Sequence, residues 1–283
     1  MPSAPSHLLI NPDWLEERLG EPELRIIDAT WYLPSEGRDA RAEYAQGHLP
    51  GAVYLDLSTD LADAHAPVRN TVASPEALAR AFGAAGIGTD HRVVVYDRRG
   101  GYSAGRVWWT LRYAGQTQAA LLDGGFTRWQ REGRPVTTEL PDLPPVCFDA
   151  APQPRWLVHK QDVLRITREG GARIVDARSA ERFHGQAPET TRHKGHIPGS
   201  INVPHRRNLE GDTHVLRDLE SLRRIYEDAG VRFDRPVVTS CGSGVTAGLA
   251  AFALTLCGHP DVSVYDGSWA EWGNSDDVPL EAD

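Results

Sequence analysis

The sequence predicts an α/β protein made of two similar domains, each a parallel sheet with helices on both faces. Short β-rich apolar runs alternate with helix-compatible segments, which is typical of parallel strands joined by crossover helices. The same landmarks also occur twice along the chain, in the same order. A chain of 283 residues is long enough for two domains of ordinary size. Together these observations indicate a duplicated domain.

Three landmarks define the repeat, and each contains residues that end a strand or form a turn. They are 26–29 (IIDA) with 174–177 (IVDA), 47–52 (GHLPGA) with 195–200 (GHIPGS), and 122–126 (LDGGF) with 265–269 (YDGSW). Because His48 and His196 occupy equivalent places in both halves, we expect them to order a turn and not to act in catalysis.

The boundary between the halves is rich in proline. Residues 141–145 (PDLPP) and 152–154 (PQP) read as a linker. We therefore predict a first domain over residues 1–140, a linker over 141–155 and a second domain over 156–283.

The elements that frame a ligand site can be placed from local patterns. In the first half, residues 25–28, 93–96 and 119–122 read as buried strands. Helices are predicted over 75–82, with Ser74 as N-cap and Pro75 at the first helical position, and over 104–113. In the second half, residues 236–239 predict a strand and 247–254 a helix. Ligands of such folds bind at the carboxyl ends of the strands.

Cys241 lies at one of these strand ends, immediately before a helix. The backbone N–H groups at a helix start have no intrahelical partners, and with the helix dipole they favour a thiolate over a thiol. Glycines allow the loop to form a concave nest of N–H groups. The predicted loop consists of Cys241, Gly242, Ser243, Gly244, Val245 and Thr246. The pattern indicates a nucleophilic sulfur.

The other cysteines lack this context. Cys257 ends an apolar run and Cys147 lies in the proline-rich stretch, so both read as ordinary residues. In the first half, alignment of the repeats places Asp97 at the position of Cys241. A carboxylate cannot act as a sulfur nucleophile, so we expect the first domain to be non-catalytic and to form a wall of the active cleft.

The two sets of motifs resemble the tandem rhodanese family of sulfurtransferases, from about Pro12 to Pro279. The loop CGSGVT is similar to that of the 3-mercaptopyruvate sulfurtransferases within this family. The resemblance implies transfer of sulfane sulfur from 3-mercaptopyruvate, through a persulfide on Cys241, to a thiol or cyanide. Thiosulfate-preferring members carry basic residues after the cysteine, where this chain has Gly242 and Ser243. Thiosulfate:cyanide sulfurtransferase is the alternative activity.

The resemblance also implies roles for individual residues. Arg182 matches the family's first substrate arginine, and an arginine fork suits a carboxylate. The loop that should supply a second arginine is shorter here, and Arg192 is the best match, with Lys194 as the alternative. Ser243 is expected to hydrogen-bond the donor or to relay a proton.

The chain departs from the family at an aspartate and a histidine that some members place beside the serine. The aspartate position reads Ser58, and the histidine position falls near residues 69–70 (RN). Asp60, Asp63 and His65 lie nearby, and no spacing selects one of them.

Composition limits the classes of partner, cofactor and compartment that are expected for this chain. A net charge of −9 argues against non-specific binding of nucleic acid, and no apolar run is long enough to span a membrane. Three cysteines and residues 1–7 without a secretory signal predict a cytoplasmic protein. The histidines and cysteines show no metal-ligand spacing, so no metal or organic cofactor is expected. A small-molecule donor, a thiol acceptor and a thioredoxin-like protein are the expected partners.

Two further classes remain as competitors. Cysteine-dependent phosphatases and arsenate reductases close a similar loop with an arginine six residues after the cysteine, where this chain has Ala247. A non-catalytic rhodanese module would fit the first half, but the intact loop at Cys241 opposes it for the whole chain.

Overall fold

The computed structural model describes residues 7–282 and has two parallel five-stranded sheets, one in each half of the chain. Residues 1–6 lie outside the described residues. They form most of the segment on which the expectation of no secretory signal was based. The elements of the first half are β1 (Leu9–Ile10), α1 (Pro12–Glu16), β2 (Leu24–Asp28), a 3₁₀ turn (Pro34–Glu36), α2 (Ala40–Gln46), β3 (Ala52–Tyr54), α3 (Pro75–Ala84), β4 (Arg92–Tyr96), α4 (Ala104–Tyr113), β5 (Ala119–Leu122) and α5 (Gly125–Arg131).

The second half repeats this order of strands. Its sheet runs β6-β10-β9-β7-β8, which is the counterpart of β1-β5-β4-β2-β3. The predicted fold class is therefore confirmed. The elements are a 3₁₀ turn (Pro154–Trp156), β6 (Leu157–Val158), α6 (Lys160–Glu169), β7 (Arg173–Asp176), α7 (Ala180–Phe183), β8 (Ile201–Asn202), a second 3₁₀ turn (His205–Asn208), α8 (Leu219–Asp228), β9 (Val237–Ser240), α9 (Val245–Leu256), β10 (Val262–Tyr265) and α10 (Ser268–Trp272).

Local sequence signals account for the central elements. β4 carries Val93, Val94 and Val95, all fully buried, because a parallel strand is covered on both faces. Ser74 caps α3 by accepting a hydrogen bond from the backbone N–H of Ala77 (3.3 Å), as its sequence position predicts. The helix after Cys241 begins at Val245, two residues earlier than the apolar run alone indicated.

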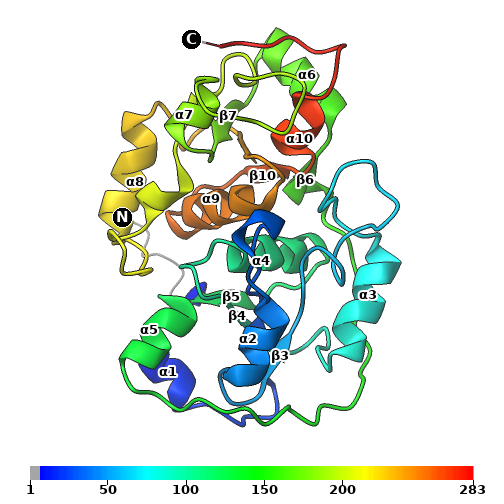
Figure 1. Ribbon diagram of the computed structural model, residues 1–283, viewed down its shortest axis with the longest axis vertical. Helices are drawn as coiled ribbons and strands as arrows, with labels where there is room; N and C mark the ends of the chain where they lie inside the picture. The colour runs from blue at the N-terminus through cyan, green and yellow to red at the C-terminus, as the bar shows by residue number, and fades with distance from the viewer. Residues whose placement is uncertain (1–6, 283) are drawn as a thin grey trace.

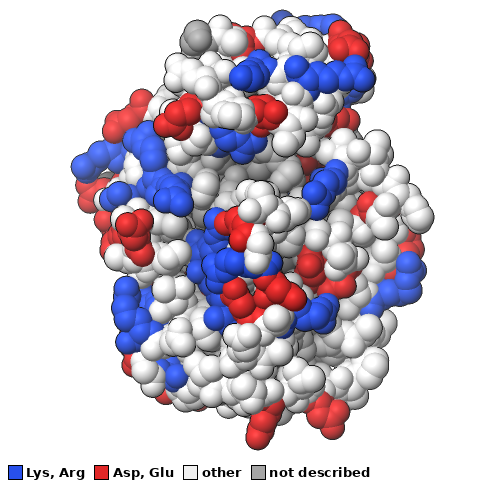
Figure 2. Space-filling view, in the orientation of Figure 1, with Lys and Arg blue, Asp and Glu red and all other residues white. Residues whose placement is uncertain are grey.

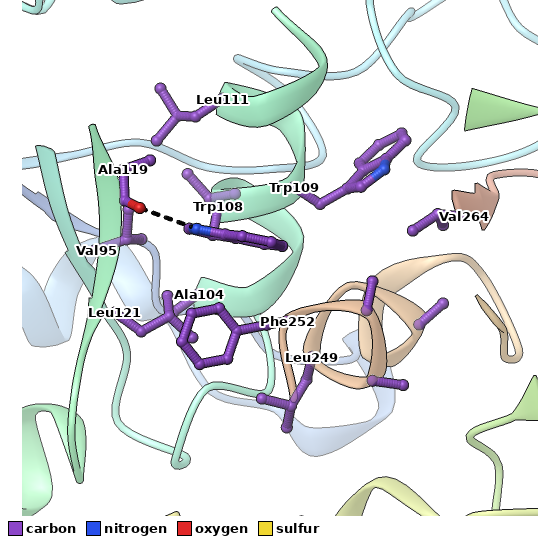
Figure 3. Close-up of a cluster of buried hydrophobic side chains, with 14 of the residues drawn as sticks. Val95, Ala104, Trp108, Trp109, Leu111, Ala119, Leu121, Leu249, Phe252 and Val264 are labelled. Carbon is purple, nitrogen blue, oxygen red and sulfur yellow. Dashed lines mark hydrogen bonds between the residues drawn. The ribbon is translucent and has the colours of Figure 1, made fainter. Parts of the chain in front are cut away.

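The two halves pack through α4 and α9, which lie side by side at the centre of the molecule (Figure 1). Both helices carry glycine at the crossing. A Cβ on Gly105 would lie 2.6 Å from the Cα of Leu249, and one on Gly248 would lie 2.6 Å from the Cα of Arg106. Trp108 packs edge-on against Phe252, with ring centroids 5.0 Å apart (Figure 3). The glycines therefore permit a close helix crossing, and large apolar side chains fill the space beside it.

A reciprocal pair of hydrogen bonds crosses the same boundary. The carboxylate of Asp123 in the first half accepts from the backbone N–H of Leu216 (3.1 Å), and that of Asp266 in the second accepts from Val72 (2.8 Å). The residues two positions before the donors, Asn70 and His214, also correspond to each other. Both have a left-handed backbone, with φ of 63° and 64°. Each half thus holds a turn of the other against the end of its own sheet.

The histidines of the repeated turn motif have buried, structural surroundings. Nδ1 of His48 donates to the carbonyl of Tyr44 (2.8 Å), and the imidazole stacks on the Tyr44 ring. His196 does the same at Phe183, with Nδ1 3.0 Å from the carbonyl oxygen. Neither lines the cavity described below.

Residues 141–153 have no regular structure and run along the first half. The backbone N–H of Val146 donates to Gly83, and that of Ala151 donates to Ala114.

Charges of both signs are interspersed over the face seen in Figure 2. Among residues 7–282, no helix is long and apolar enough to cross a membrane.

Candidate active site

Cys241 follows the last residue of β9, and its side chain is almost completely buried. Its backbone is fixed on both sides: its N–H donates to Oγ of Ser268 (3.1 Å), and its carbonyl accepts from the N–H of Trp269 (3.0 Å). The thiol lines a cavity of about 700 Å³, together with Ser243 and Thr246 of the predicted loop. A cavity of this volume accommodates a small organic ligand.

The other two thiols lie elsewhere. Cys257 follows α9, and burial raises the pKa of its thiol to about 12, so it stays protonated. Cys147 is exposed in the segment between the two halves. Neither contributes to the cavity.

The loop after Cys241 presents unused hydrogen-bond donors. Among the described residues, none of the backbone N–H groups from Gly242 to Thr246 has an acceptor. Gly244 has a left-handed φ of 77°, and a Cβ there would lie 2.6 Å from the carbonyl oxygen of Asp266. The loop conformation therefore requires glycine at this position and leaves several donors free for an anion.

The first half has a longer loop at the equivalent strand end, between Tyr96 of β4 and Ala104 of α4, and the donors of this loop are occupied. The carboxylate of Asp97, the residue aligned with Cys241, is 1% exposed. Its Oδ1 accepts from the N–H groups of Arg99 (2.8 Å) and Gly101 (2.9 Å). Its Oδ2 accepts from those of Ser103 (2.8 Å) and Ala104 (2.9 Å). An anion held by a ring of loop N–H groups is therefore seen directly in the non-cysteine copy.

Arg182 lies against the Cys241 loop. A Cβ on Gly242 would come within 3.0 Å of its Nη2. Nε and Nη2 donate to Glu189, each at 2.8 Å, and Glu189 is itself held by the fully buried Arg178 (3.1 Å). Burial lowers and the Glu189 carboxylate raises the pKa of Arg182, with a net rise, so the guanidinium stays charged. Nη1 has no hydrogen-bond partner among residues 7–282 and remains available to a ligand.

The first half also contributes to the lining of the cavity. Trp31, Arg69, Asn70 and Tyr102 all line it. Burial, and then the charge of Cys241, raise the pKa of Tyr102, so its phenol stays neutral.

Several residues named from the sequence lie outside the cavity lining. Arg192 is 65% exposed and forms an ion pair with Asp276 (2.8 Å), and Lys194 is exposed. The structure does not bring Asp60, Asp63 or His65 to the cavity. Ser58 accepts a hydrogen bond from the indole of Trp31 (3.2 Å) instead.

Three residues of the cavity lining, Glu189, Tyr102 and Arg69, were not predicted from the sequence to have a role in the site. Glu189 holds Arg182 across a short irregular loop, and such a contact leaves no periodic pattern in the sequence. Tyr102 and Arg69 reach the cavity from the other half of the chain. The repeat offered one signal, because it aligns Tyr102 with the loop around Cys241.

Within the part of the chain that the structure describes, no group of three or more His, Cys, Asp or Glu side chains is arranged to hold a metal ion.

The chain contains two copies of one α/β domain, and the second copy carries a cysteine in a glycine-rich loop at a strand end. This fold and this site define a class of tandem-domain proteins. The Rhodanese-like domain model matches residues 11–132 and 159–275, and the chain belongs to this family.

Relatives are similar over nearly their full lengths. A 3-mercaptopyruvate sulfurtransferase of Escherichia coli K12 is 39% identical over 276 residues, covering 96% of this chain and 97% of the relative. A thiosulfate sulfurtransferase of Rattus norvegicus is 39% identical over 273 residues, covering 93% and 91%. The crystal structure of SseA from Escherichia coli superimposes with a TM-score of 0.84 at 38% identity, covering 92% of this chain and 98% of that one.

Proposed function

We propose that the protein is a 3-mercaptopyruvate sulfurtransferase that carries sulfane sulfur as a persulfide on Cys241. The observation that carries the proposal is the contrast between the two loops. In one, N–H groups surround the carboxylate of Asp97; in the other, the N–H groups from Gly242 to Thr246 are free around a thiol. A persulfide anion on Cys241 gives these donors the acceptor that they lack.

The reaction uses nucleophilic catalysis by the thiolate. The Cys241 thiolate attacks the sulfur of 3-mercaptopyruvate, and an S–S bond forms as the donor's C–S bond breaks. The electron pair of that bond leaves on carbon as the enolate of pyruvate, which takes the proton of the transferred thiol and becomes pyruvate. The persulfide remains. An acceptor thiolate or cyanide then attacks the outer sulfur, and the Cys241 thiolate leaves.

Individual residues support these steps. Nη1 of Arg182 binds the donor carboxylate, while Glu189 fixes the orientation of the guanidinium. Ser243 lines the cavity and hydrogen-bonds the donor or relays the proton. Arg192 acts as a second cation. It is more distant from the donor than Arg182, because its side chain lies outside the cavity lining.

Thiosulfate is the alternative donor, since one relative of equal identity is named a thiosulfate sulfurtransferase. The loop itself carries no cation to meet a dianionic donor. A non-catalytic binding module is disfavoured by the buried thiol that opens into the cavity.

The proposal also covers the organisation and setting of the enzyme. Residues 1–140 form a non-catalytic domain with Asp97 in its loop, 141–155 a linker, and 156–283 the catalytic domain. The three cysteines are free thiols, which supports a reducing, cytoplasmic setting with a thioredoxin-like protein as sulfur acceptor.

The test is the fate of the sulfur atom. Treatment with 3-mercaptopyruvate should add one sulfur atom to the protein, seen by intact mass, and peptide mapping should place it on Cys241. Cys241→Ser should abolish sulfur transfer with both donors, while Cys257→Ser, the matched control, should retain it. Substantial activity in Cys241→Ser, or an unmodified Cys241 after donor treatment, would contradict the proposal.

A further inference from the structure

Four groups that line the active-site cavity carry charge when Cys241 is a thiolate. Among the Asp, Glu, Lys and Arg side chains of residues 7–282, those in the lining are Arg69, Arg182 and Glu189, and the fourth group is the Cys241 thiolate. Glu189 forms two hydrogen bonds with Arg182 and is 3% exposed. The charges of this pair largely cancel at a distance, so Arg69 is the cation of the lining that is left to face the Cys241 thiolate and an anionic donor.

Arg69 is free to meet a ligand. Its side chain is exposed, and it has no hydrogen bond or ion pair with any of the described residues. Most arginines beside the cavity, by contrast, are engaged: Arg182 and Arg178 with Glu189, and Arg106 with Asp266.

The backbone that carries Arg69 is held in place. Arg69 lies in a turn closed by Thr71, whose Oγ1 donates to the carbonyl of Val68 (2.8 Å). The next residue, Asn70, is buried with a left-handed φ of 63°, and its carbonyl accepts from Nη2 of Arg106 (2.6 Å). Two residues further, the N–H of Val72 donates to Asp266 (2.8 Å). An exposed side chain that lines the cavity is thus carried by a backbone fixed on both sides.

We infer that Arg69, contributed by the non-catalytic domain, binds the carboxylate of the 2-oxo acid donor and determines donor specificity together with Arg182. The inference rests on the proposed function. Arg182 supplies its free Nη1 from the second half, and Arg69 supplies an unpaired guanidinium from the first. A carboxylate between two guanidinium groups accepts charge-assisted hydrogen bonds from both. The first domain then supplies a group that touches the substrate.

Sulfur transfer has two separate steps, so an effect of Arg69 on the donor step can be distinguished from an effect on the acceptor step. In a ping-pong reaction, kcat/KM for the donor reports only the first step, and kcat/KM for the acceptor reports only the second. Arg69→Gln should lower kcat/KM for 3-mercaptopyruvate by about tenfold or more, because a charge-assisted hydrogen bond is lost. The value for a thiol acceptor should stay unchanged, and the salt dependence of the donor step should weaken.

Matched variants complete the experiment. Arg69→Lys retains the charge and should restore part of the donor kcat/KM. Arg80→Gln removes an exposed arginine of α3, in the same half but outside the cavity, and should change neither step. The melting temperature of Arg69→Gln should match that of the unchanged protein, since Arg69 has no partner to lose.

The outcomes are distinct. A loss in Arg69→Gln that is no larger for the donor than for the acceptor, including no loss at all, would overturn the role of Arg69. The rate of persulfide formation on Cys241, followed by intact mass in a single turnover, gives the same comparison without an acceptor. If the unchanged protein forms no persulfide with 3-mercaptopyruvate, the proposed function itself is wrong.

Discussion

Nη1 of Arg106 lies 2.6 Å from the carboxylate of Asp266 across the boundary between the two domains, and both side chains are buried. Nη1 also donates to the carbonyl of Gly244 in the Cys241 loop (3.3 Å), and the guanidinium packs over Trp109 at 4.4 Å. Arg106 therefore joins α4 of the first half both to Asp266, at the end of β10, and to the Cys241 loop of the second half.

Removing one partner of this pair should destabilise the protein strongly. Arg106→Met leaves the Asp266 carboxylate buried without a counter-charge, so the free energy of unfolding should fall by about 3–5 kcal/mol. Urea denaturation measures this. Arg224→Met removes a solvent-exposed ion pair with Glu220 and should change stability by less than about 1 kcal/mol. Equal losses of unfolding free energy in the two variants would contradict this stabilising role of the Arg106–Asp266 pair.

The buried carboxylate of Asp97 should be essential to the first domain's stability and dispensable for sulfur transfer. Asp97→Asn turns one acceptor oxygen into a donor that faces at least two N–H groups, which should cost about 2–5 kcal/mol of unfolding free energy. Asp142→Asn, at an exposed carboxylate, is the control. With the fold retained, kcat/KM should change little. A stable Asp97→Asn variant with no sulfurtransferase activity would assign Asp97 a different role.

Arg182 should contribute to donor binding through its free Nη1. Arg182→Ala should lower kcat/KM for 3-mercaptopyruvate by about 10- to 150-fold, the equivalent of one charge-assisted hydrogen bond. Arg192→Ala should have a smaller effect, because its guanidinium is exposed and paired with Asp276. Steady-state kinetics with both variants make the comparison. A larger loss in Arg192→Ala would place the carboxylate elsewhere.

The charge of the loop should set the preference between donors. Ser243→Lys adds a cation beside the cavity and should raise thiosulfate activity relative to mercaptopyruvate, with a stronger salt dependence. The ratio of the two kcat/KM values measures this, and an unmoved ratio would contradict it, as would an unmodified protein that prefers thiosulfate.

The companion substitution Gly242→Arg acts by a second route. Its Cβ would lie 3.0 Å from Nη2 and 3.2 Å from Nη1 of Arg182, so the new side chain displaces Arg182 as well as adding charge. In Gly242→Arg/Ser243→Lys we therefore expect thiosulfate activity to rise and mercaptopyruvate activity to fall further than in Ser243→Lys alone. Gly242→Ala separates the steric part, and it should lower mercaptopyruvate activity without raising thiosulfate activity.

Local and periodic features of the sequence predicted the sheets, the helices α3 and α4, and the position of Cys241. Valine runs, the Ser74 cap and the repeated turn motifs each act over a few residues. The second wall of the cavity was not predictable in this way. Arg69 lines the same cavity as Cys241 because the φ of Asn70 and the buried Arg106 fix a turn from the other half, and contacts between distant segments leave no periodic signal.

The occupied loop of the first domain has a consequence for synthesis on the ribosome. Asp97 satisfies its own N–H groups, so this half needs no ligand to complete its loop. Domains generally fold as units, the N-terminal one first. The turn that bears Arg69 is held by Asp266, which is synthesised well after the whole of the first half. A chain interrupted before that residue would lack this contact, and the part of the cavity lining that carries Arg69 would not be fixed.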